Sequence, residues 1–362
     1  MLKIYLLALF YLPSVYSIIP NFPELLIQGD SLSGYSENTI SLPKNIAADS
    51  SKNISLDTNL YITEKEFYYA NQYRVSLDGK LPYRKTQIKP ITAGIVFTIA
   101  ASSLVALHIH QRNTWWSGTR TAFHFQEDWV SALQADKFGH AYGTYITSYY
   151  AAEAFSVSGL SWEDANIYGG LFGLACQTFV ETEDGYAKDW GFSPSDWYFD
   201  AIGSLFFIAQ YKVPYLQNFT PKLLWFPSEL QGKPKIDRPR TIIDDYNSES
   251  FWISANVHNL LEDDLKKYWP EWLFIAVGYG ADAIDVIIDP NGPVDQLSKR
   301  RFMISLDFSI TKLLPKGGTQ WNWWVQSLDR FKWPSPTIEF TKGRTKFYLV
   351  YPIRIDLGQV KL

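Results

Sequence analysis

Residues 137–155 read KFGHAYGTYITSYYAAEAF, and this stretch of small, aromatic and aliphatic residues predicts a helix. Two stretches of the same character follow at 162–180 and 194–211, and an apolar run at 91–109 without Asp, Glu, Lys or Arg precedes it. Consecutive helices joined by modest loops alternate in direction. The sequence therefore predicts an antiparallel bundle of about four apolar helices.

Serine residues mark the starts of the last two helices. Ser161 with Asp164, and Ser193 with Asp196, fit the Ser-x-x-acid capping pattern. Pro194 stands at the first helical position, where proline is favoured. These signals predict helix starts after Ser161 and Ser193.

Glycine pairs recur within the predicted helices. Gly139 with Gly143, and Gly169 with Gly173, have the Gly-x-x-x-Gly spacing that lets two helices approach closely. We therefore expect tight helix packing.

The residue pattern of the chain changes after Tyr211. Five prolines interrupt residues 213–250, and short alternating runs rich in aromatic residues follow at 272–279, 302–310, 337–340 and 346–355. Such runs, bounded by turn residues, are typical of strands. We predict an α+β fold, in which the helical bundle is followed by a small antiparallel, aromatic-rich β region.

The N-terminus predicts export. Met1 to Ser17 combine one lysine, a short apolar core and small residues before position 18, as in a cleaved signal peptide. Residues 18–88 are polar and read as a loosely structured arm, with a helix-forming stretch from Glu64 to Tyr73. The predicted organisation is: 1–17 signal peptide, 18–88 arm, 89–212 helical bundle, 213–250 Pro/Lys-rich connection and 251–362 strand-rich region.

Composition favours membrane contact and argues against nucleic acid as a partner. Aromatic residues make up 17% and charged residues 19% of the chain, whereas soluble domains carry about 25% charged residues. The net charge of -4 offers no basic field for a polyanion. A single cysteine, Cys176, excludes an internal disulfide and a thiolate zinc site.

The location remains open between two readings. The signal peptide favours a periplasmic or outer-membrane-associated protein of the cell envelope, with the run at 91–109 buried or resting on a membrane. The alternative is a multi-pass inner-membrane protein, because about 20 apolar residues suffice to cross a bilayer. A lipid anchor near the N-terminus is unsupported, because there is no cysteine near it to carry the lipid.

The helix order predicts one cluster of ionisable residues. The start of the second helix, the end of the third and the start of the fourth meet at one end of an antiparallel bundle. These positions carry the candidate catalytic residues, which are Asp136, Lys137, His140, Glu181 and Asp196. Each also has a structural interpretation, as a helix cap, an ion pair or a buried histidine.

These residues carry a family resemblance. The series Asp136-Lys137-x-x-His140, Gly173, Gln177, Glu181, Asp184-Gly185, Gly191-Phe192-Ser193-x-x-Asp196 and Gly203 resembles the YfiM-type family of predicted bacterial envelope lipoproteins of unknown function. More loosely, it is similar to VanZ-like membrane proteins, which tend to carry Asn where this chain has Asp200. The resemblance covers about residues 110–212 and implies an envelope location, without implying a reaction.

Three functional hypotheses follow. The cluster is a structural element of an envelope protein that binds a membrane, a protein or a lipid-linked partner. Alternatively, it belongs to a hydrolase or transferase acting on a lipid-linked or glycan precursor, with Glu181 or His140 as general base, Asp136 orienting His140, and Lys137 stabilising negative charge. The third hypothesis is a site for a hard divalent ion held by His140 with Asp136, Glu181 and Asp196. No sequence motif identifies a cofactor.

Overall fold

The computed structural model describes residues 59–353 except 228, 232–244 and 285–297. The predicted signal peptide at 1–17 and residues 18–58 of the predicted arm lie outside the described residues. The predicted helix from Glu64 to Tyr73 is wrong, because a small hairpin occupies its second half, with β1 (Tyr68–Tyr69) antiparallel to β2 (Gln72–Tyr73). Ala70 and Asn71 form the turn with φ of 49° and 60°, the left-handed backbone that a two-residue hairpin requires.

Four long helices form where the apolar runs predicted them. They are α3 (Pro90–Asn113), α4 (Ala135–Val157), α5 (Trp162–Asp184) and α6 (Pro194–Lys212). The serine caps are confirmed, since Ser161 Oγ accepts from the amide of Asp164 at 3.0 Å and Ser193 Oγ from that of Asp196 at 3.3 Å.

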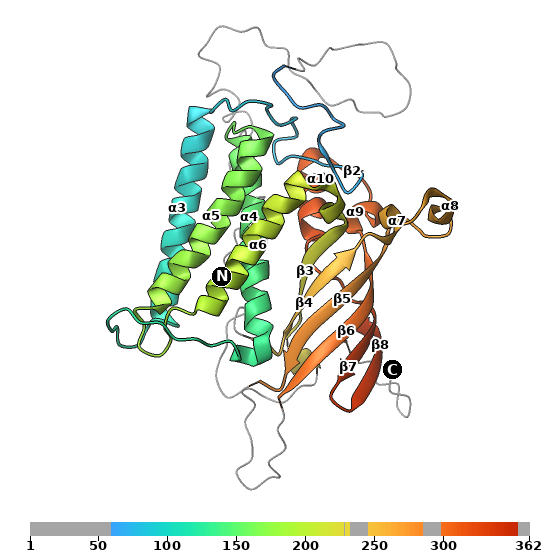
Figure 1. Cartoon of the computed structure of the whole chain (residues 1–362). Helices are drawn as coiled ribbons and strands as arrows, with labels where there is room; N and C mark the ends of the chain where they lie inside the picture. The colour runs from blue at the N-terminus through green and yellow to red at the C-terminus, as the bar shows by residue number, and fades with distance from the viewer. Residues whose placement is uncertain (1–58, 228, 232–244, 285–297, 354–362) are drawn as a thin grey trace, which may run out of the picture.

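Helices α4, α5 and α6 pack directly on one another, whereas α3 lies at the side of this group (Figure 1). A Cβ atom at Gly173 of α5 would lie 2.9 Å from the carbonyl oxygen of Thr144 in α4, so the predicted close approach is confirmed there. Gly139 instead faces the ring of Phe251 in the sheet. Only Thr92, Leu107 and Gln111 of α3 are buried. The structure thus shows a helical region, but it does not confirm a four-helix bundle.

The β region is a six-stranded antiparallel sheet in which each strand pairs with the next in sequence. The strands are β3 (Phe219–Trp225), β4 (Glu249–Ala255), β5 (Leu273–Asp282), β6 (Lys299–Phe308), β7 (Ser335–Thr341) and β8 (Arg344–Tyr351). The four predicted runs fall on β5 to β8, so the sheet is larger than expected. Strand β3 lies inside the segment that we interpreted as a connection, and Pro221 is tolerated there because β3 is an edge strand.

Short helices complete the described fold. They are η1 (Ser131–Gln134), η2 (Pro214–Asn218), η3 (Glu229–Gln231), α7 (Val257–Leu260), α8 (Asp263–Lys266), α9 (Ile310–Leu313) and α10 (Thr319–Leu328). Helix α10 lies near one end of the sheet, beside the hairpin β1–β2 (Figure 1).

The sheet curls around one face and leaves the other largely exposed. On the inner face, the rings of Trp252 on β4 and Tyr351 on β8 lie 5.8 Å apart although three strands separate them in the sheet. Near the helices the sheet joins the main core, where Leu223 and Phe251 pack with Tyr142 of α4.

The outer face carries an aligned apolar row. The register pairs Ile253 with Val277, Val277 with Ile304, Ile304 with Ile338, and Ile338 with Phe347. These side chains are 38–60% exposed. Soluble sheets usually present alternating polar residues to water, so this outer row has the opposite polarity.

Candidate functional site

The helix order brings the predicted site residues together. Asp136, Lys137 and His140 lie in the first turns of α4, Glu181 in the last turn of α5, and Asp196 in the first turn of α6. All five lie at the same end of the helices, as the alternation of helix direction predicted. We call this set, together with Asp128 and Asp200, the acidic cluster.

Lys137 is the central cation of the acidic cluster. Its ammonium group lies 2.9 Å from Oδ2 of Asp136 and 2.5 Å from Oδ1 of Asp196, and it also donates to Asp128. The side chain is fully buried. Burial alone would lower the pKa of Lys137, but the charges of Asp136 and Asp196 outweigh it and raise this pKa above its ordinary value.

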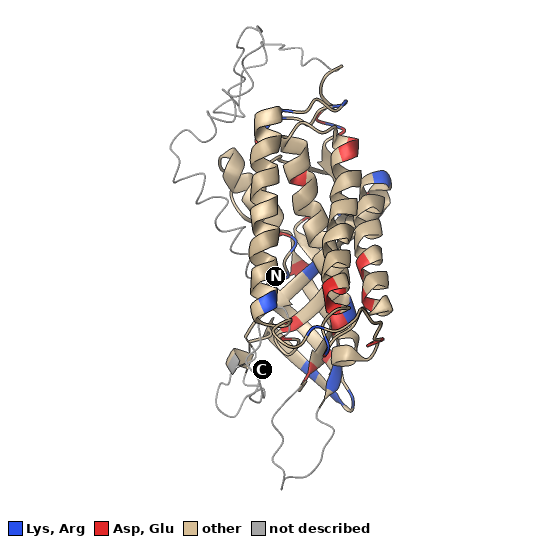
Figure 2. Cartoon of the chain, turned by 90° about the vertical axis from the view of Figure 1, so that its left-hand side faces the viewer, with Lys and Arg blue, Asp and Glu red and all other residues tan. Residues whose placement is uncertain are grey.

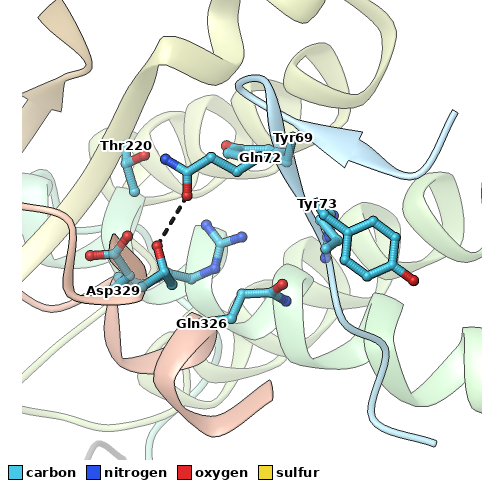
Figure 3. A pocket seen from close by; sticks show the side chains of 9 residues that line it. Tyr69, Gln72, Tyr73, Thr220, Gln326 and Asp329 are labelled. Carbon is cyan, nitrogen blue, oxygen red and sulfur yellow. Dashed lines mark hydrogen bonds between the residues drawn. The ribbon is translucent and has the colours of Figure 1, made fainter. Parts of the chain in front are cut away.

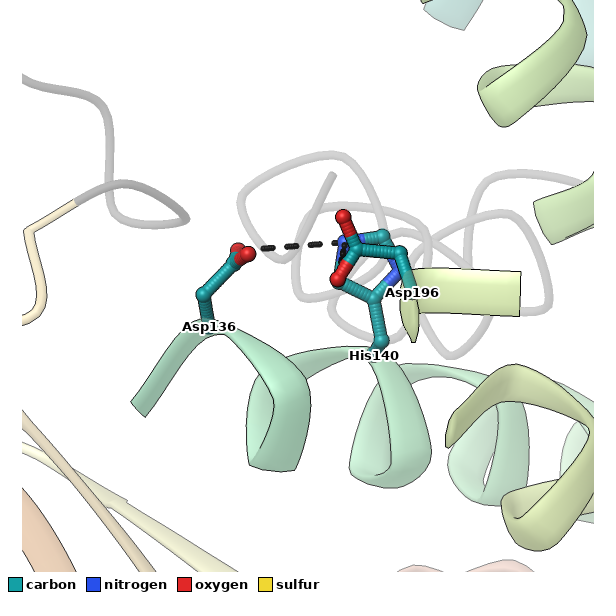
Figure 4. A group of neighbouring side chains, drawn as sticks. All are labelled: Asp136, His140 and Asp196. Atoms are coloured by element: carbon teal, nitrogen blue, oxygen red, sulfur yellow. Dashed lines mark ion pairs between the residues drawn. The ribbon is translucent and has the colours of Figure 1, made fainter. Parts of the chain in front are cut away.

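His140 is the second cation centre, and its two ring nitrogens face different carboxylates. Nδ1 lies 3.2 Å from Oδ1 of Asp200 and 3.8 Å from Oε1 of Glu181. Nε2 lies 3.8 Å from Oδ1 of Asp136 and 3.7 Å from Oδ1 of Asp196, the side drawn in Figure 4. Burial opposes a charge on the ring, but the surrounding carboxylates, Asp200 first, raise the pKa of His140 well above its ordinary value. The imidazole is therefore protonated at neutral pH.

Two carboxyl groups of the acidic cluster hold protons unusually tightly. Burial raises the pKa of Glu181 from 4.5 to about 9, against the opposing charge of His140. Burial also raises the pKa of Asp196 from 3.8 to about 7. For Asp136 the desolvation is outweighed by the charges of His140 and Lys137, so its pKa is lowered. Glu181 is thus a neutral acid at pH 7, whereas Asp136 is a carboxylate.

Several members of the site were not among the candidates. Asp200 accepts from Thr144 Oγ1 at 2.9 Å as well as facing His140. Asp200 is not among the residues that the sequence predicts; its spacing of four residues from Asp196 on one helix is the signal that could have found it. Tyr246, in the segment before β4, donates to Oδ1 of Asp136.

Asp128 is placed by an unusual turn of the chain. Ala132, Leu133 and Gln134 all have positive φ, of 44°, 56° and 69°, directly before α4. Such a run costs free energy in residues other than glycine. Tyr279 helps to hold it by donating to the carbonyl of Leu133. Nothing in the sequence pattern signals this reversal, which is why Asp128 was missed.

The acidic cluster offers two sets of metal-ligand type. Asp136, His140 and Asp196 form one, and His140, Glu181 and Asp200 the other, each with its atoms within 4.8 Å of one another. The first set already holds the ammonium of Lys137, a cation that competes with a metal ion for the same carboxylates. The second set has no lysine between its carboxyl groups, so it fits a divalent ion better.

Part of the chain is similar to a known protein family. Residues 124–212 match the family model described as predicted periplasmic lipoprotein (DUF2279). The predicted cell-envelope location, in the periplasm, is confirmed by this match. The matched segment includes every residue of the acidic cluster. No curated protein and no solved structure matches the chain.

Proposed function

We propose that the acidic cluster is an acid–base site of an envelope hydrolase or transferase, with His140 as the group that exchanges a proton with the substrate. The observation that carries this proposal is the contact of the fully buried Asp200 with Nδ1 of His140 at 3.2 Å. A carboxylate on one ring nitrogen fixes the orientation of the imidazole and leaves Nε2 for chemistry. The side chain of His140 keeps 19% of its surface exposed, whereas Lys137, Glu181 and Asp200 are nearly or fully sealed.

The other residues then take supporting roles. Burial raises the pKa of Glu181 to about 9, so at neutral pH Glu181 adds no second negative charge 3.8 Å from Nδ1 of His140, and Asp200 is the carboxylate that orients the ring. Lys137 cannot contact a substrate, since it is fully buried among three carboxylates. We therefore assign Lys137 a positioning role rather than the stabilisation of negative charge that we first expected.

A purely structural role, in which ion pairs only hold the helix ends together, explains the composition of the acidic cluster less well than the acid–base proposal does. Five carboxyl groups, from Asp128, Asp136, Glu181, Asp196 and Asp200, surround the two cations Lys137 and His140. Oδ2 of Asp200 is buried and accepts no hydrogen bond from the described residues. Buried ion networks contribute little net stability, and unsatisfied buried polar atoms call for an explanation. Burial and neighbouring charges shift the pKa of Glu181 upward and that of Asp136 downward, and carboxyl groups with such opposed pKa values are the arrangement that proton transfer needs.

The location and two apolar surfaces support a proposed substrate class. Helix α3 carries no Asp, Glu, Lys or Arg before Arg112 in its last turn. Figure 2 shows this helix almost without blue or red. Among the described residues it is the one helix that is long and apolar enough to cross a membrane. The outer row of the sheet is also apolar and exposed. Both surfaces suit contact with a bilayer, so the proposed substrate is a lipid-linked or glycan precursor of the envelope.

The test is an activity screen of the purified full chain in detergent against lipid-linked glycan precursors and chromogenic phosphate, acyl and glycosyl esters. We expect turnover of at least one substrate, and a loss of about 100-fold to 10,000-fold in His140→Gln. Asp200→Asn should lose most of the rate while keeping the fold by circular dichroism. His258→Gln is the matched control, because His258 lies on α7, away from the acidic cluster (Figure 1), and its Nδ1 contacts the carbonyl of Trp269 at 2.8 Å.

Equal rates in the wild type and in His140→Gln would reject the acid–base role. A second rejecting outcome is an inactive wild type whose folding stability falls in both cluster variants, since that is the behaviour of a structural lock. Purified wild type that carries a stoichiometric metal ion, lost in Glu181→Gln and Asp200→Asn, would replace the acid–base proposal with a metal centre.

A further inference from the structure

A second polar site lies away from the acidic cluster. A cavity of about 80 Å³ opens between the hairpin β1–β2, strand β3 and the end of α10. Figure 3 shows side chains from these elements around it, with Gln72 Oε1 accepting from Thr311 Oγ1 at 3.0 Å. In Figure 1 the hairpin and α10 lie near the ends of α4 and α6 opposite to the acidic cluster.

Two arginines line this cavity, and they differ in their partners. Arg74 forms a buried ion pair with Glu153. Arg330 is only 6% exposed and has no carboxylate within ion-pair distance among the described residues. Its Nη1 donates to Tyr145 Oη at 2.7 Å, and its guanidinium stacks 3.7 Å from the ring of Tyr149. Nε of Arg330 is buried without a hydrogen-bond partner.

The neighbouring acid does not neutralise Arg330. The carboxylate of Asp329 accepts from the backbone amide of Ile310 at 3.0 Å and from Ser309 Oγ at 3.2 Å. It also pairs with the buried Lys222 at 3.4 Å. Lys222 also pairs with Asp307 at 2.9 Å, and Asp307 with Lys332 at 3.5 Å, so two lysines match the two acids Asp329 and Asp307. Arg74 is matched by Glu153, so the charge of Arg330 has no carboxylate partner among the described residues around the cavity.

A buried guanidinium without a counter-charge is costly. We propose that the cavity binds a small oxyanion, a phosphate or carboxylate group, with Arg330 as its counter-charge. The planar guanidinium suits such a group because it donates parallel hydrogen bonds. Gln72 uses its oxygen for Thr311, so its NH₂ end is the part that donates to the anion. A cavity of about 80 Å³ accommodates one oxyanion headgroup, not a nucleotide.

The experiment measures binding to the full chain in detergent at constant ionic strength. Inorganic phosphate, glycerol 1-phosphate and acetate are titrated separately, by calorimetry and by thermal stability, with chloride as the reference. We expect saturable binding that raises Tm. Tightest binding of inorganic phosphate would identify free phosphate as the ligand. Tightest binding of glycerol 1-phosphate would identify a lipid-type headgroup, and tightest binding of acetate a carboxylate.

Two variants test the role of the cavity. Arg330→Gln should weaken binding at least tenfold, whereas Arg84→Gln should leave it unchanged, because Arg84 lies on the surface and pairs with Glu66 at 2.8 Å. Gln72→Glu places a carboxylate inside the cavity and leaves the stacking of Arg330 intact. It should abolish anion binding and raise Tm in the absence of anion, which decides the question even where Arg330→Gln does not fold.

The proposal is overturned by the absence of any saturable effect beyond ionic strength. It is also overturned by anion affinity that persists in Gln72→Glu. Neither result bears on the acid–base role of His140, which lies in another part of the fold.

Discussion

Nδ1 of His140 on α4 lies 3.2 Å from Oδ1 of Asp200 on α6, although sixty positions separate the two residues in the chain. The same oxygen of Asp200 accepts from Thr144 Oγ1 at 2.9 Å. Asp200 is thereby fixed between α4 and α6, and it is the first cause of the raised pKa of His140. The proton state of the imidazole thus depends directly on the packing of these two helices.

Removal of this carboxylate should lower the pKa of His140. In Asp200→Asn the side chain keeps its size and its contact with Thr144, but the charge that favours the imidazolium is lost. NMR titration of labelled histidine measures the change. Asp263→Asn is the control, because Asp263 is exposed and pairs with Lys266 at 2.6 Å on the surface. An unchanged titration in Asp200→Asn would show that Asp200 does not set the charge of His140.

Loss of the buried ammonium should destabilise the fold strongly. Lys137→Met leaves Asp136 and Asp196 without the cation at 2.9 and 2.5 Å, and breaking a buried pair costs about 3–5 kcal/mol. Urea unfolding followed by circular dichroism measures the free energy of unfolding. Lys212→Met serves as control, since its pair with Glu163 is exposed and should matter much less. Equal losses in the two variants would contradict a central role for Lys137.

The location of the acidic cluster could be predicted from the sequence because helix order alone brings three helix ends together. Asp136, Lys137, His140, Glu181 and Asp196 all meet there. Asp128 and Tyr246 were not predictable, because both lie outside the regular elements. Their positions depend on the left-handed turn before α4 and on the docking of the sheet against the helices.

The number of strands in the sheet was underestimated because its polar residues are buried. Its inner face holds buried charges, among them Lys222 paired with Asp307 at 2.9 Å, while its outer face is apolar. The usual assumption that polar positions face water would place the charged inner face of such strands in solvent and their apolar outer face in the core. For β3 the proline and lysine content therefore predicted a connection, whereas Lys222 is fully buried on a strand.

The outer row of the sheet should contribute to membrane binding. Ile304→Asp combined with Phe347→Asp places two charges in the exposed apolar row. Burial of such side chains is worth about 1.5–3 kcal/mol each, so we expect binding to anionic phospholipid vesicles to fall tenfold or more. Vesicle flotation measures the bound fraction. Lys316→Asp, an exposed change outside the row, is the control; comparable binding by the row variant and the control would exclude this surface as the contact.

The stability of the fold should decrease as the pH rises through the neutral range. The pKa of Glu181 is about 9 in the folded protein and 4.5 as its ordinary value, so the folded state holds the proton more tightly. Its contribution is complete below pH 4.5 and is lost as the pH rises towards 9. The raised pKa of His140 acts in the same direction. Glu181→Gln, which imitates the neutral acid, should flatten the dependence measured by urea unfolding between pH 5 and 9; an unaltered slope would mean that Glu181 does not hold its proton.

The close packing of α4 and α6 should control both stability and the site. A Cβ atom at Gly203 of α6 would lie 2.1 Å from the carbonyl oxygen of Ala141 in α4, a contact that only a backbone shift relieves. Overpacking of this kind costs about 1–3 kcal/mol. Because Asp196 and Asp200 lie on the same helix, the shift should also move their carboxylates away from the imidazole.

Gly203→Ala should therefore lower both the free energy of unfolding and the pKa of His140. Gly94→Ala in α3 is the matched control, because nothing lies within 4 Å of a Cβ atom there. Alanine is the better helix former by about 1 kcal/mol, so Gly94→Ala should leave the fold equally or more stable. A destabilised Gly203→Ala whose histidine titrates as in the wild type would separate the packing of α6 from the geometry of the site, since a moved Asp200 cannot hold the imidazole proton as before.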